Sequence, residues 1–178
     1  MRVLPIAFAS ALGLAALSTA VQGQKADAQV DARSVALLDQ ARAAHRAGSL
    51  EQANDLLETA LAVDPKNRAA FIELAEVAKA QGLPGKAIRF YREALELEPN
   101  DRAALVGQGD ALVQKGAVTK ARENLAKLKQ VCNGACPEEA RLAALIEKGP
   151  PPAVLSAQAT TKVPAPGAEQ KTRTPQQQ

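Results

Sequence analysis

The residues of this chain that could do chemistry are few, and two cysteines are the most informative of them. Cys132 and Cys136 are four positions apart and enclose the helix-breaking pair Asn133-Gly134. In an oxidising compartment an even pair of this kind usually forms a disulfide, and the break in the helix allows the sulfur atoms to meet. Cys136 also precedes Pro137 at an expected helix start, where the helix dipole favours a thiolate. We expect a structural disulfide and keep thiol-redox or metal-handling work as the alternative.

The remaining inventory argues against an enzyme. His45 is the only histidine in the sequence, and the chain has neither a nucleophile motif nor a glycine-rich phosphate loop. Acidic pairs such as Glu73 and Glu76 are typical of solvated helix faces. The two cysteines and one distant histidine are too few ligands for a metal site. We therefore predict no catalytic residue, no cofactor and no bound metal.

Composition narrows the class of protein further. The 178 residues have a formal net charge of +3, and 47% are apolar although only 2% are aromatic. A net charge so small and so evenly spread argues against a nucleic-acid partner. A core of Ala, Leu and Val with few aromatic residues suits close-packed helices better than a sheet.

Residues 1–28 have the features of a secretory signal peptide. Arg2 supplies a positive charge, and an apolar run follows over Val3–Leu17. The small residues after this run offer three cleavage sites, which follow Ala20, Gly23 and Ala28. An uncleaved anchor is the alternative, but the run is short and rich in alanine for a membrane span. We expect a protein exported to the bacterial periplasm, with no stable membrane insertion after cleavage and a flexible lead over residues 29–33.

A period of 34 residues organises the middle of the chain. Pro65 and Pro99 stand 34 positions apart in two similar loops, and glycine, small and bulky residues recur at the same spacing. The columns are Gly48/Gly82/Gly116, Ala41/Ala75/Gly109, Ala53/Ala87/Ala121 and Leu57/Tyr91/Leu125. The period divides the chain into units at 34–67, 68–101 and 102–135.

Each unit is expected to form two antiparallel helices. The recurring glycines stand where a first helix ends, a position that favours the left-handed conformation. Asn67 and Asp101 are expected to cap the first helices of the next units. Ser49 and Gln52 are expected to form a capping box at the second helix of the first unit.

Two further segments follow the third unit. Pro137–Lys148 is amphipathic, so residues 136–149 are expected to form a capping helix that covers the end of the last unit. Residues 150–178 are rich in Pro, Gln and Thr, and they cannot bury enough apolar surface to offset chain entropy. We expect this tail to be disordered.

The columns resemble the tetratricopeptide repeat (TPR) family over about residues 34–133. The third unit departs from the pattern at its end, where Leu128 replaces an alanine and Asn133 replaces the proline. The resemblance implies an all-α fold: a solenoid of antiparallel helix pairs, with three TPR units and a C-terminal capping helix. The chain is similar to a small exported bacterial TPR protein.

The resemblance also implies where a partner would bind, because ligands of this family usually lie on the concave surface lined by the first helices. The corresponding groove positions here are Leu38, Asp39, Arg42, Arg46, Ile72, Glu73, Glu76, Val106 and Asp110. The apolar members, Leu38, Ile72 and Val106, are 34 residues apart and would form one exposed stripe between acids and arginines. The same three side chains also fit a place in the core. The acids have the wrong sign for the family's carboxylate clamp.

These features together predict a non-enzymatic protein-binding scaffold in the periplasm. It would hold a peptide or protein partner in the concave groove, within an envelope or secretion-related assembly. The fold alone does not prove this function. The alternative is a thiol-redox or metal-handling accessory protein that acts through Cys132 and Cys136.

Overall fold

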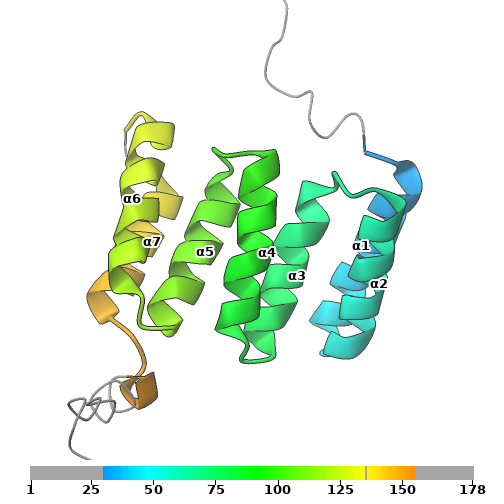
Figure 1. Ribbon diagram of the computed structural model, residues 1–178, viewed down its shortest axis with the longest axis horizontal. Helices are drawn as coiled ribbons and strands as arrows, with labels where there is room; N and C mark the ends of the chain where they lie inside the picture. Colours follow the sequence, from blue (N-terminus) through cyan, green and yellow to red (C-terminus); the bar gives the residue numbers. More distant parts are fainter. Residues whose placement is uncertain (1–29, 135, 155–178) are drawn as a thin grey trace, which may run out of the picture.

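The computed structural model describes residues 30–134 and 136–154, and the regular structure in that part of the chain is helical (Figure 1). The helices are α1 (Ala32–Arg46), α2 (Leu50–Val63), α3 (Arg68–Ala80), α4 (Pro84–Leu97), α5 (Arg102–Gln114), α6 (Val118–Cys132) and α7 (Pro137–Lys148). Three antiparallel pairs, α1–α2, α3–α4 and α5–α6, stack side by side, and α7 packs against the last pair. The expected all-α solenoid of helix pairs is confirmed.

The small-residue columns lie where neighbouring helices meet. Ala41 and Ala53 of the first pair are fully buried, as are Ala75 and Ala87 of the second. Alanine at such contacts lets two helix backbones approach closely, so that the larger side chains interdigitate around them. The same offsets recur in every unit because each pair repeats the same packing.

The turns within the pairs follow the expected glycine pattern. Gly48, Gly82 and Gly116 have φ angles of +79°, +72° and +81°. Asn67 and Asp101 are N-caps whose side chains accept hydrogen bonds from the N–H groups of Ala70 and Ala104, as predicted.

The predicted capping box at Ser49 is wrong. Ser49 is the N-cap of α2, but its side chain makes no capping hydrogen bond. The tight glycine turn uses backbone bonds instead: Ser49 N–H donates to Ala44 C=O and Leu50 N–H donates to Gly48 C=O. These bonds hold the turn without the side chain.

Buried polar groups tie the first two units together. The Ser34 hydroxyl donates to the carbonyl of Ala60 at 2.7 Å, and the Asn67 side-chain amide donates to Ser34 Oγ at 2.8 Å. Both Ser34 and Asn67 are buried, and a buried polar group is costly unless it is hydrogen-bonded. Asn67 therefore caps α3 and also links it to the first pair.

Both ends of the solenoid differ from the expected boundaries. Asp31 caps α1, and residues 32 and 33 already belong to the helix, so the flexible lead expected at 29–33 is wrong for residues 31–33. Residues 152–154 form a helical turn, so the expected disorder does not apply at 150–154. The predicted signal peptide at 1–28 and the tail from residue 155 lie outside the described residues. No helix of the described part is both long and apolar enough to cross a membrane.

Helix α7 covers the exposed end of the third pair. Leu142 of α7 is fully buried in a cluster with Leu105, Val106 and Leu128. A Cβ atom added to Gly109 would lie 2.6 Å from a Leu142 methyl carbon, so this position must stay small. Leu128, which departs from the alanine column, fills space beside α7 that an alanine would leave empty.

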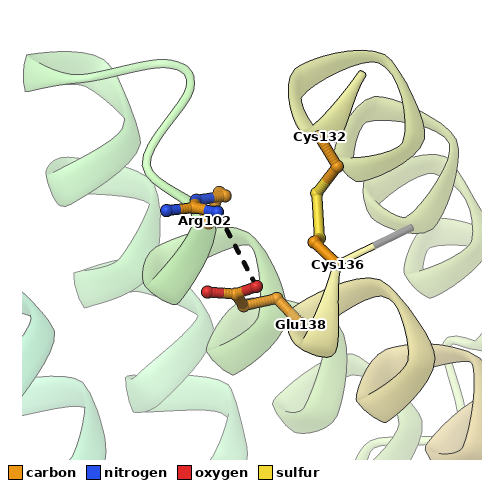
Figure 2. The surroundings of a disulfide bond; sticks show 4 residues. All are labelled: Arg102, Cys132, Cys136 and Glu138. Atoms are coloured by element: carbon orange, nitrogen blue, oxygen red, sulfur yellow. Dashed lines mark ion pairs between the residues drawn. A yellow bond between two sulfur atoms is a disulfide. The ribbon is translucent and has the colours of Figure 1, made fainter. Parts of the chain in front are cut away.

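A disulfide joins Cys132, the last residue of α6, to Cys136, the N-cap of α7 (Figure 2). The chain turns between them through Asn133 and Gly134, which both have positive φ angles. A loop this short would stabilise the fold by about 2 kcal/mol in the chain-entropy model. The bond fixes where α7 begins relative to α6.

The glycine turns lead to a stability prediction. Gly82→Val should lower the free energy of unfolding by about 1–2 kcal/mol, because a β-branched residue resists positive φ. Nothing lies within 4 Å of the added Cβ, so the loss would come from the backbone alone. Urea unfolding monitored by circular dichroism measures it.

Gly85→Ala is the matched control, because Gly85 lies in the first turn of α4 with only an ordinary 3.7 Å contact at its Cβ position. This variant should be as stable as the original chain or more stable. Equal stability of the Gly82→Val variant and the original chain would show that the turn does not need glycine.

Candidate functional site

A cleft of about 360 Å³ opens on the side of the solenoid that the first helices line. It lies between α3, α5 and α7, and its lining residues are Ile72, Glu76, Ala103, Val106, Gly107, Pro137, Glu138 and Arg141. Three of the predicted groove residues, Ile72, Glu76 and Val106, therefore come together here. The capping helix supplies the third wall.

The floor of the cleft depends on a close contact between Tyr91 of α4 and Gly107 of α5. The Tyr91 side chain is fully buried, and its ring occupies the space where a Cβ atom of residue 107 would lie. Its hydroxyl donates a hydrogen bond to Glu76 at the cleft wall. Burial and, secondly, this hydrogen bond raise the pKa of Tyr91 well above its usual range, so the hydroxyl stays protonated.

The predicted exposed apolar stripe is wrong at two of its three positions. Leu38 is 3% exposed and Val106 is 4% exposed. Leu38 packs in a core cluster with Leu57 and Leu74, because α1 leans on both α2 and α3. Val106 is covered by the neighbouring α6 and α7 leucines, although its edge still lines the cleft. Ile72 alone remains partly exposed.

Two acids of the groove, Glu73 and Asp110, are paired with side chains of the neighbouring first helix. Glu73 of α3 lies 2.7 Å from His45 Nδ1 and 3.6 Å from Arg42 Nε, both on α1. Lys79 of α3 lies 2.7 Å from Asp110 of α5. These pairs connect successive first helices, so the Glu73 and Asp110 carboxylates are largely engaged by contacts within the solenoid.

The other charged positions are less engaged. Glu76 pairs with Lys79 one helical turn away, at 3.2 Å. Asp39 is exposed and lies 3.3 Å from Arg42, and Arg46 is exposed at the end of α1. Exposed pairs of this kind contribute little to stability. Asp39 and Arg46 lie outside the cleft.

The residues that α7 contributes were missed by sequence reasoning, although the repeat contains a signal for them. Continued by one more period of 34, the register places Pro137 in the column of Ala103, and Arg141 in the column of Gly107. Arg141 is exposed at the cleft, and Glu138 lies 3.9 Å from Arg102 (Figure 2). Helix α7 thus acts as the first helix of a fourth, incomplete unit.

The two cysteines lie beside this wall without lining the cleft. Among the described residues, no group of three or more His, Cys, Asp and Glu side chains is placed to hold a metal ion. The two cysteine sulfur atoms are joined to each other in the disulfide between α6 and α7.

The fold is a helical-repeat solenoid. Its antiparallel helix pairs are stacked, α7 adds a half unit at the end, and the cleft lies on the side of the first helices. A family model of the tetratricopeptide repeat matches residues 38–101 and 74–140. The chain belongs to the tetratricopeptide repeat family. A comparison with curated protein sequences gives no match.

Solved structures with the same fold include TPR domains of several proteins. The Sgt2 TPR domain from Aspergillus fumigatus is 21% identical, with a TM-score of 0.61 over 80% of this chain and 92% of that one. The first TPR of Spaghetti (RPAP3), bound to an HSP90 peptide, is 15% identical, with a TM-score of 0.60 over 67% and 95%. The Yersinia enterocolitica type III secretion chaperone SycD, in complex with a peptide of the translocator YopD, is 18% identical, with a TM-score of 0.59 over 73% and 98%.

The contact under the cleft leads to a second prediction. Gly107→Ala should lower the free energy of unfolding by about 1–3 kcal/mol, because the added methyl group overlaps the buried Tyr91 ring. Thermal and urea unfolding measure the loss.

Two further variants make this prediction specific. Gly109→Ala should cost less, because the atoms it meets are the terminal methyl groups of Leu142, which can rotate. Replacing Tyr91 by Leu should remove most of the additional cost of Gly107→Ala, which a double-mutant cycle detects. Additive losses would contradict the contact.

Proposed function

We propose that this protein is a non-enzymatic scaffold that holds a peptide or a protein segment in the cleft between α3, α5 and α7. The observation that carries the proposal is the cleft itself, which combines an apolar floor with charged groups at its rim. Concave sites with an apolar lining and a few polar groups are where proteins usually bind ligands. The cleft lies on the face that the repeat predicts for a partner.

The structural neighbours support binding of a peptide. The Spaghetti domain is described with an HSP90 peptide, and the SycD chaperone with a peptide of its translocator. Both share the stacked helix pairs of this chain. Because their sequence identity to it is low, the likeness establishes the fold but not the ligand. The class of ligand, an extended or helical peptide, is what we carry over.

The cleft favours a peptide with an apolar side chain as its main contact. Ile72, Val106 and Gly107 leave an apolar surface with room above it, while the Glu76 carboxylate already accepts a hydrogen bond from Tyr91. Burial of one large apolar side chain would supply most of the affinity. The paired acids of α3 and α5 would instead set the rate of association and its salt dependence.

We further propose that the protein acts in the bacterial periplasm, within an envelope or secretion-related assembly. The leader-like residues 1–28 support export, and the Cys132–Cys136 disulfide fits an oxidising compartment. The short inventory of catalytic side chains supports a scaffold that performs no reaction.

The experiment compares capture of envelope proteins by tagged variants in the producing organism. Ile72→Asp should reduce capture of the specific partner at least about tenfold, because a charge would be buried against the apolar contact. Ala103→Arg should do the same by filling the cleft from an exposed position, which carries less risk to the fold. Quantitative mass spectrometry of the captured proteins is the readout.

Two variants serve as controls. Val35→Asp changes an apolar residue that is 41% exposed on α1 and outside the cleft, so capture should be retained. Deletion of residues 155–178 should also retain it. Capture that survives both cleft variants but is lost with the tail would contradict the proposal.

A further inference from the structure

One edge of the solenoid carries an unusual distribution of charge. The turns within the three pairs, α1–α2, α3–α4 and α5–α6, lie along the lower edge in Figure 1, and the C-terminal end of α7 reaches the same edge. We call the part formed by residues 81–86 and 115–122 the basic edge. Its cations are Lys86, Lys115, Lys120 and Arg122, and it contains no Asp or Glu.

This excess is local, because the described residues as a whole carry equal numbers of Lys+Arg and Asp+Glu. The opposite edge, formed by the loops between pairs and the helix starts that follow them, mixes both signs. Asp64 and Lys66 precede Arg68 at the start of α3, and Glu98 and Asp101 precede Arg102 at the start of α5. The even spread of charge expected from the sequence is therefore wrong for the basic edge.

Lys115 of the basic edge reaches the residue next to Lys86, and the lysines of this edge are not neutralised. The Lys115 ammonium group lies 3.7 Å from the Cβ position of Gly85, which brings the α5–α6 turn against the first turn of α4. Lys86 contacts neutral groups, the Phe90 ring and the Asn54 side-chain oxygen. None of Lys86, Lys115 and Lys120 forms an ion pair with another described residue.

The basic edge also carries an exposed leucine. Leu83, at the tip of the α3–α4 turn, is 47% exposed and is one of three large apolar side chains exposed in the described part. A protruding apolar side chain on the same turns as lysines suits a flat anionic surface better than a peptide. The first turns of α4 and α6 hold no acid, so the helix dipoles add to the positive potential.

We propose that the basic edge is a peripheral membrane-binding surface that docks on anionic phospholipid bilayers. Lys86, Lys115 and Lys120 would contact phosphate groups, and Leu83 would enter the region between headgroups and acyl chains. The helix axes would then stand roughly upright on the membrane, with the cleft on a side wall and open to a partner. Docking of this kind is independent of peptide binding and does not span the bilayer.

The test uses sedimentation with vesicles and the chain without residues 1–28, because the helices and the core of the described residues lie after that segment. The chain should bind vesicles of equal parts phosphatidylglycerol and phosphatidylcholine, and bind phosphatidylcholine alone only weakly. Reversal of Lys86, Lys115 and Lys120 to Glu should weaken binding at least about tenfold, since each cation near the surface contributes about fivefold. Raised salt should also weaken binding.

The chain offers matched controls for both parts of the surface. Reversal of Lys66, Arg92 and Lys129 to Glu makes the same change in net charge on exposed residues away from the basic edge, and should weaken binding far less. Leu83→Ser should reduce binding several-fold, whereas Leu97→Ser, 40% exposed at the other end of α4, should not. Circular dichroism verifies that each variant is folded.

Several outcomes would overturn the proposal. Equal binding to both kinds of vesicle would show that anionic lipid is not recognised. Equal losses of binding from the two triple reversals would show that the basic edge is not the binding surface. Tighter binding to a DNA duplex or to polyglutamate than to anionic vesicles, through the same lysines, would assign the edge to another partner. Ile72→Asp should bind vesicles normally, which separates this result from a failure of the peptide cleft.

Discussion

The close approach of helix backbones at alanine and glycine is the constraint on which this structure depends. Ala41, Ala75 and Gly109 occupy one column, and Ala53, Ala87 and Ala121 another, and these alanines are fully buried. Larger residues there would push the pairs apart and open the core between them. Gly107 extends the rule to a position outside the columns, since the ring of Tyr91 lies where its side chain would be. A side chain at residue 107, which lines the cleft, would have to displace that ring.

The charged side chains that pair between neighbouring first helices set how the units are placed relative to one another. The pairs between α1 and α3 and between α3 and α5 join neighbouring units, and partly buried pairs of this kind fix geometry more reliably than they add stability. They also make the middle of the groove nearly neutral. Arg141 at the cleft and the lysines of the basic edge are left as the charges most available to partners. Two surfaces with different chemistry therefore face different directions on one small solenoid.

Much of the fold could be predicted because it depends on local rules. The glycines at positive φ and the caps at Asn67 and Asp101 are each set by the backbone conformation at one position, and the 34-residue period repeats such positions along the chain. The site was predicted less well. Burial of Leu38 and Val106 depends on which helices pack against them. Glu73 and Asp110 each pair with a side chain of the preceding unit, His45 and Lys79 respectively. The α7 wall was missed because the period was not continued past the third unit.

The central claim, that a partner lies in the cleft formed by α3, α5 and α7, is tested most directly by site-specific photo-crosslinking in living cells. A photoreactive residue at Ala103 lies at the cleft, and one at Ala126 lies on the exposed face of α6 as the control. A discrete adduct from position 103, absent from position 126 and lost when Ile72 is also changed to Asp, is the predicted result. The same adduct from position 126, or its persistence with Ile72→Asp, would contradict the account.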